Sequence, residues 1–182
     1  MNKMVAAAAL SLLALTACKN KDEIYANPPQ QMVDGVEALM PAAKEFVFTA
    51  QDEALEQGPP LSEYYLDIAK ELGVQYPEKV RVYYVDKLPS PTDPTLSQIA
   101  HKAGYAGSNM AGYTYGYGIW IANRYKNQRG LLEHELYHVK QAEELGLEEQ
   151  TRQYLLQMYV YGYTNSPMKS TPGKQLPSIC KK

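Results

Sequence analysis

One stretch of the chain reads His134-Glu135-Leu136-Tyr137-His138, and the other elements can be placed around it. Histidines four residues apart on a helix lie one above the other on the same face, within reach of one metal ion. A glutamate directly after the first histidine can accept a proton from an attacking water molecule. The chain has only three histidines, so two of them at this spacing indicate a metal site rather than a chance arrangement.

The sequence around this stretch predicts a helix over residues 128–145 that ends at Gly146. Leu132, Leu136 and Val139 recur at helical spacing and form one apolar face, which would pack on a sheet. The two histidines lie on a different face of the same helix.

Other patterns predict the elements that surround this helix. Helices are expected over 41–57, from Ser62 to Gly73, over 95–103 and over 148–161, because apolar residues recur at helical spacing between capping residues and breakers. Strands are expected over 80–85 and 113–121, where β-branched and aromatic residues concentrate. The chain is thus predicted to be an α+β domain over 32–166, with a small sheet packed on the central helix and a polar C-terminal tail over 167–182.

The expected strand over 113–121 has glycines on one side. Large residues alternate on the other side, and Gly116 and Gly118 leave the opposite side bare. Glycines in a strand let a ligand approach the backbone closely, or they mark a bulge or close packing against a helix. The sequence does not choose between these interpretations.

The N-terminal segment indicates export and a lipid anchor. Residues 4–15 are almost all apolar, too short to span a bilayer, and fit the core of a signal peptide. The following Leu15-Thr16-Ala17-Cys18 resembles the lipobox of bacterial lipoproteins. That resemblance implies a signal peptide over 1–17, a lipid on Cys18 and a membrane as partner; the alternative is an ordinary secretory signal. Residues 18–31 are then expected to be a tether, and Lys19 at the next position favours the outer membrane of a bacterial cell envelope.

Composition excludes several classes of function. With 18 basic and 20 acidic residues and no basic stripe, the chain is not expected to bind nucleic acid. Acylation of Cys18 would leave Cys180 as a single thiol, which cannot form an internal disulfide. The chain has no Gly-x-Ser-x-Gly sequence, so a serine nucleophile is not indicated.

A family resemblance sharpens this interpretation. Residues 133–141, which read EHELYHVKQ, resemble the active-site helix of zincin-type metallopeptidases and are most similar to bacterial members with HELxHVxQ. The resemblance extends over about 80–167 and implies a zincin-like fold, Zn²⁺ held by His134 and His138, and Glu135 as catalytic base. Lys140 departs from the extended pattern, in which an apolar residue is preferred.

A third protein ligand is missing from the position where such proteins place it. Their downstream acid would fall in 167–172, which reads PMKSTP and has no carboxylate, and thermolysin-like spacing reaches Gln157 and Met158 instead. Other residues remain as candidates with ordinary structural roles as the alternative: His101, Glu143, Glu144, Glu148 and Glu149.

The sequence thus predicts a membrane-anchored zinc peptidase that hydrolyses peptide or protein substrates, which could add as a strand along 113–121. A non-catalytic zincin-like envelope lipoprotein, used for binding or assembly, is the alternative that the missing ligand favours. A metal-scavenging protein is a third possibility, but the chain lacks the His-rich or Cys-rich tracts typical of one.

Overall fold

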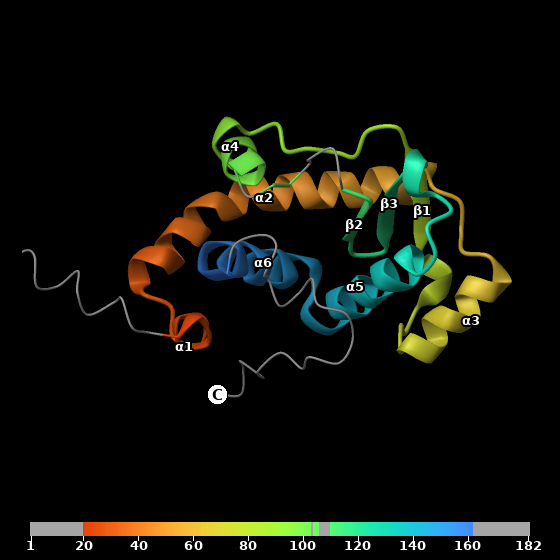
Figure 1. Cartoon of the computed structure of the whole chain (residues 1–182), viewed down its shortest axis with the longest axis horizontal. Helices are drawn as coiled ribbons and strands as arrows, with labels where there is room; N and C mark the ends of the chain where they lie inside the picture. Colours follow the sequence, from red (N-terminus) through yellow and green to blue (C-terminus); the bar gives the residue numbers. More distant parts are fainter. Residues whose placement is uncertain (1–19, 103, 106–109, 162–182) are drawn as a thin grey trace, which may run out of the picture.

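The chain folds as an α+β protein in a computed structural model that describes residues 20–102, 104–105 and 110–161. A three-stranded sheet lies between long helices (Figure 1). In chain order the elements are α1 (Lys21–Ala26), α2 (Gln30–Gln57), α3 (Glu63–Leu72), the 3-10 turn η1 (Pro77–Lys79), β1 (Arg81–Val85), α4 (Pro94–Lys102), β2 (Gly112–Tyr115), β3 (Gly118–Ala122), the 3-10 turn η2 (Asn123–Tyr125), α5 (Leu131–Leu145) and α6 (Leu147–Tyr161).

The sheet has the order β1-β3-β2, with β3 in the middle. β1 pairs with β3 in parallel, whereas β2 pairs with β3 antiparallel through a two-residue turn at Gly116 and Tyr117. The single strand expected over 113–121 is therefore wrong, because the chain reverses in its middle. Gly116 adopts φ +57°, a backbone conformation that residues with a side chain rarely take up.

One face of the sheet packs on α5, as the apolar spacing of that helix predicts. Leu136 and Val139 are fully buried against Ile119 and Ile121 of β3, and α3 closes the same core from the side. Full burial of such a side chain contributes about 1.5–3 kcal/mol relative to exposure. This core fixes α5 on the sheet, and the expected apolar face of the helix is confirmed.

The other face of the sheet packs on α2, and the glycines serve this contact. A methyl group at Gly118 would lie 2.9 Å from Cβ of Ala54 and 3.0 Å from the carbonyl oxygen of Gln51. Trp120 donates a hydrogen bond from Nε1 to the carbonyl of Ala50, 2.9 Å away. Of the two interpretations left open by the sequence, helix packing is the one that applies to Gly118.

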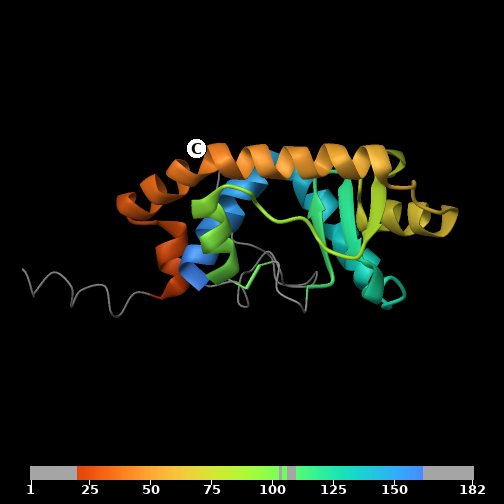
Figure 2. The same ribbon diagram turned by 90° about the horizontal axis from the view of Figure 1, so that it is seen from above.

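The helix α2 begins at Gln30, eleven residues before the expected start at Pro41. Proline lacks only one backbone donor, and the helix accommodates it with a change of direction along its length (Figures 1 and 2). The early part of α2 is held by tertiary packing, since Val36, Leu39 and Met40 are buried with Leu96 of α4 and Leu155 of α6. The expected start at Pro41 is therefore too late, because tertiary packing extends the helix beyond the position at which proline favours a helix start.

The helix α1 lies against α6, within the segment expected to be a tether. Tyr25 is only 5% exposed, and its hydroxyl accepts a hydrogen bond from Nε2 of Gln157 at 3.0 Å. Tyr161 donates a hydrogen bond to Asp22 at 2.6 Å and contacts the ring of Tyr25 edge to face. Residues 21–26 are therefore part of the folded domain rather than a free linker.

The remaining expected elements match the structure within a few residues. α3 ends at Leu72 and is capped by Gly73 at φ +90°, α4 covers Pro94–Lys102, and α6 ends at Tyr161. No helix among the described residues is both long and apolar enough to cross a membrane. The segment 1–17 expected to be a signal peptide, Cys18 and the expected tail over 167–182 lie outside the described residues.

Gly118→Ala is expected to destabilise the fold by about 1–3 kcal/mol, because the added methyl group meets Ala54 and the rigid backbone of α2. Urea unfolding would measure the change. Gly35→Ala, within α2, is the matched control, since its added methyl group lies 3.7 Å from its nearest neighbour, the hydroxyl of Tyr159, and should stabilise the helix by about 0.5–1 kcal/mol. Equal effects of the two changes would contradict the assigned packing role of Gly118.

Candidate metal centre

The helix α5 places its chemistry opposite its apolar face. It starts at Leu131 after Gly130, which takes a left-handed conformation at φ +81°. Since Leu132, Leu136 and Val139 face the core, His134 and His138 are turned to another side and are partly buried there. The apolar face of α5 therefore packs on the core, and the two histidines lie on a different side of the helix.

The two imidazole rings converge on each other. Their Nε2 atoms are 3.1 Å apart, and the ring planes are nearly perpendicular at 89°. Two Zn–N bonds of about 2.0–2.1 Å at a tetrahedral angle require nitrogens about 3.4 Å apart. The pair is therefore close to the separation that one zinc ion needs, and without metal one ring can donate a hydrogen bond to the other.

Neighbouring amides fix the second histidine. Nδ1 of His138 lies 2.7 Å from Oε1 of Gln141, one helical turn later. If Nδ1 carries the proton and donates it to this oxygen, the lone pair of Nε2 is directed at the partner ring, which is the tautomer that a metal requires. Gln150 of α6 donates a hydrogen bond to the backbone carbonyl of His138 at 3.0 Å and so joins the two helices at the site.

Glu135 is buried beneath the edge strand β2. It is 4% exposed, and its Oε2 accepts a hydrogen bond from the Thr114 hydroxyl at 2.7 Å. A side chain at Gly112 would come within 3.2 Å of its other oxygen, Oε1, so the glycine leaves room for the carboxylate. The edge strand thereby both holds and accommodates the candidate base.

All three residues of the motif line one cavity of about 420 Å³. The cavity lies between α5 and α6 on one side and α2 and α4 on the other, and residues 110–115 form part of its wall. Glu135 is the only acidic or basic residue among the described lining residues, if the two histidines are set aside. An otherwise uncharged cavity with a few convergent polar groups is typical of a ligand site.

The backbone of β2 contributes polar groups to this wall. Ala122 donates a backbone hydrogen bond to the carbonyl of Ala111 at 2.9 Å, so these two opposite residues form a hydrogen-bonded pair. In an antiparallel ladder such pairs alternate with pairs that are not hydrogen-bonded to each other, which here include Gly112 and Thr114. The backbone groups of Gly112 and Thr114 therefore point away from β3. Within the described part of the chain β2 pairs with β3 alone, so these backbone groups lie along its outer edge.

The acidic candidates for a third ligand serve other partners. Glu143 accepts backbone hydrogen bonds from Gln75 at 2.7 Å and Tyr76 at 3.0 Å. Burial, followed by a hydrogen bond to the same carboxylate, raises the pKa of Tyr117 to about 12. The other acids form ion pairs on the surface: Glu144 with Lys140, Glu148 with Lys44 and Glu149 with Arg152.

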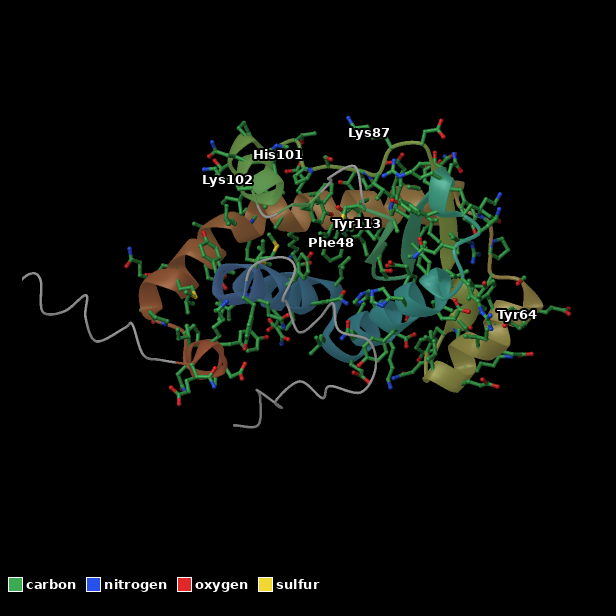
Figure 3. The ribbon with its side chains drawn as sticks, viewed as in Figure 1. Phe48, Tyr64, Lys87, His101, Lys102 and Tyr113 are labelled. Carbon is green, nitrogen blue, oxygen red and sulfur yellow. The ribbon has the colours of Figure 1, made fainter. Side chains whose placement is uncertain are left out.

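The remaining candidates lie away from the pair or outside the described residues. His101 is exposed on α4 (Figure 3), and Gln157 is fully buried against Tyr25. Met158 does line the cavity. Among residues 20–102, 104–105 and 110–161, no group of three or more His, Cys, Asp or Glu side chains could hold a metal ion. The stretch 167–172 and Cys180 lie beyond these residues.

Sequence reasoning missed several residues of the site. Four further residues line the cavity with the motif: Thr114, Gly112, Gln150 and Tyr154. Each is a common residue type that belongs to no motif in the sequence. One signal was available: Gln150 and Tyr154 recur at helical spacing on α6 and share a face. Their use at a site depends on how α6 packs, which spacing does not specify.

Comparison of the chain with protein-family models, curated proteins and solved structures finds no match.

Thr114→Val is expected to destabilise the fold by about 1–3 kcal/mol, because a buried carboxylate oxygen loses its hydrogen bond while the strand keeps a β-branched residue. Thr114→Ser keeps the hydroxyl and is the matched control, with a smaller loss. The free energy of unfolding in urea measures both. A valine variant as stable as the serine variant would contradict the anchoring role of this bond.

Proposed function

We propose that this protein is a zinc-dependent peptidase with a zincin-like fold, anchored by a lipid on Cys18 in the envelope of a bacterial cell. The observation that supports it best is the convergence of His134 and His138, with Nε2 atoms 3.1 Å apart, on a cavity that also contains the buried carboxylate of Glu135. Two histidines without a catalytic role would not need an adjacent carboxylate that is held by its own hydrogen bond.

The donor set fits zinc in part. Two imidazoles, one of them oriented through a hydrogen bond to its other ring nitrogen, are typical ligands. When bound, zinc would polarise the substrate carbonyl and lower the pKa of a water molecule in the site. His134 and His138 would hold it, and the third protein ligand is unassigned.

Glu135 would act as the general base. Its carboxylate would take a proton from the attacking water and pass it to the leaving amine as the C–N bond breaks. The hydrogen bond from Thr114 holds one oxygen of the carboxylate in place. The other oxygen, beside Gly112, is the one that we assign to proton transfer.

The edge of β2 would orient the substrate. The outward backbone groups of Gly112 and Thr114 can pair with an extended peptide, and Thr114 also holds Glu135. A peptide added to this edge would run past the base. Strand addition is thus proposed for β2 alone and no longer for the whole segment 113–121.

A non-catalytic envelope protein is the second candidate. The absence of a third His, Cys, Asp or Glu ligand among the described residues favours it. In that case the cavity would bind a partner or ligand without turnover, and the histidine pair would be a remnant or a weak metal site.

The first experiment measures zinc and hydrolysis together. The purified protein is expected to bind close to one equivalent of zinc, to lose it in His138→Ala, and to retain it in Glu135→Gln while peptide hydrolysis falls by at least about 100-fold. His101→Ala is the control and should change neither quantity, since this residue is exposed on α4. Failure to bind zinc at micromolar concentration would refute the enzyme and favour the second candidate.

The second experiment tests the orienting amide. Gln141→Leu is expected to weaken zinc binding by about 10–100-fold, because His138 loses the hydrogen bond that sets its tautomer. A competition titration with a chelator measures the affinity. Gln141→Glu keeps an acceptor at this position and should restore most of it, so an equal loss in both variants would argue against this role.

A further inference from the structure

The cavity beside the histidine pair is larger than one amino-acid side chain requires. Its volume is about 420 Å³, whereas an engineered cavity of about 150 Å³ is sufficient to bind benzene. The space could therefore hold nearly three groups of that size. A peptide that placed a single aromatic side chain here would leave most of the cavity unfilled.

The cavity is also elongated along α6. Gln150, Tyr154 and Met158 line it at successive turns of the helix, a span of about 12 Å at 1.5 Å per residue. Gln150 marks the end near the site, since it is hydrogen-bonded to the backbone of His138. An extended carbon chain advances about 1.25 Å per bond at standard lengths and angles, so about ten carbons fit this span.

Polarity changes along this length. The motif residues, with Thr114, Gln150 and Thr151, form a polar end. The lining also includes tyrosines and residues of α2 and α4. Leu96 of α4 packs in one cluster with Leu155 of α6, and Figures 1 and 2 place α4 well away from α5. The helices α2 and α4 contribute only apolar side chains to the lining: Ala43, Phe46, Val47, Leu96, Ile99 and Ala100.

We propose that this cavity binds the acyl chain of an N-acylated peptide, with the chain along α6 toward α4 and the amide end at the histidine pair. A single-chain amphiphile matches both the polarity gradient and the length, whereas a charged side chain would find no counter-ion among the described lining residues of the apolar end. This inference rests on the proposed function for hydrolysis of the substrate, but binding of the acyl chain does not require metal.

The test compares two peptides of the same sequence, one N-dodecanoylated and one N-acetylated, on the purified chain after removal of metal with a chelator. Trp120 is the single tryptophan and pairs with the cavity-lining Tyr113 across the hairpin, so its fluorescence can report binding. The dodecanoyl peptide is expected to bind at least about 100-fold more tightly, because each buried methylene favours binding. Equal affinities would overturn the proposal, as would tighter binding of an acetylated peptide with two adjacent phenylalanines.

Variants locate the binding. Ile99→Glu should weaken dodecanoyl peptide binding at least 10-fold, whereas Gln98→Glu, with its side chain exposed on the same helix, should leave it unchanged. Met158→Glu repeats the test from α6 if the first variant folds poorly. Unchanged binding in the folded cavity variants would refute the assignment. Acyl binding without zinc-dependent hydrolysis would refute the peptidase alone, and hydrolysis without acyl preference would refute this inference alone.

Discussion

The hydrogen bond between Thr114 and the buried carboxylate of Glu135 is the interaction on which the site depends. A buried carboxylate is costly unless it is paired or hydrogen-bonded, so this contact allows an acid to lie where α5 meets the sheet. It also fixes the distance between the helix and the edge strand. Because the bond comes from β2, an edge strand, the base and the outward backbone groups of β2 share one wall of the cavity.

Much of the fold follows from local patterns, and the failures have tertiary causes. α5 was predictable because its apolar face, its polar face and Gly146 agree. The hairpin was not predictable, because the alternation of large residues continues through the turn and only Gly116 indicates that the chain reverses there. The early start of α2 and the docking of α1 depend on contacts with α6, more than a hundred residues along the chain.

The candidate site was predictable in its motif and not in its surroundings. Histidines at helical spacing converge because the helix requires it, and a glutamate between them must lie nearby. The partners of that glutamate come from a strand whose register sequence patterns do not specify. The same limit applies to the acids: Glu143 holds the backbone at Gln75 and Tyr76, a role that no spacing rule indicates.

The docking of α1 has a consequence for where the protein can work. Only two residues lie between the proposed lipid on Cys18 and Lys21, so the three residue steps reach about 10 Å at full extension. With Tyr25 buried against α6, the domain would lie on the bilayer surface rather than sample the space around it. The protein would then meet its partners by lateral diffusion in the membrane. Partners in the same membrane would have a higher effective concentration at the site than dissolved ones.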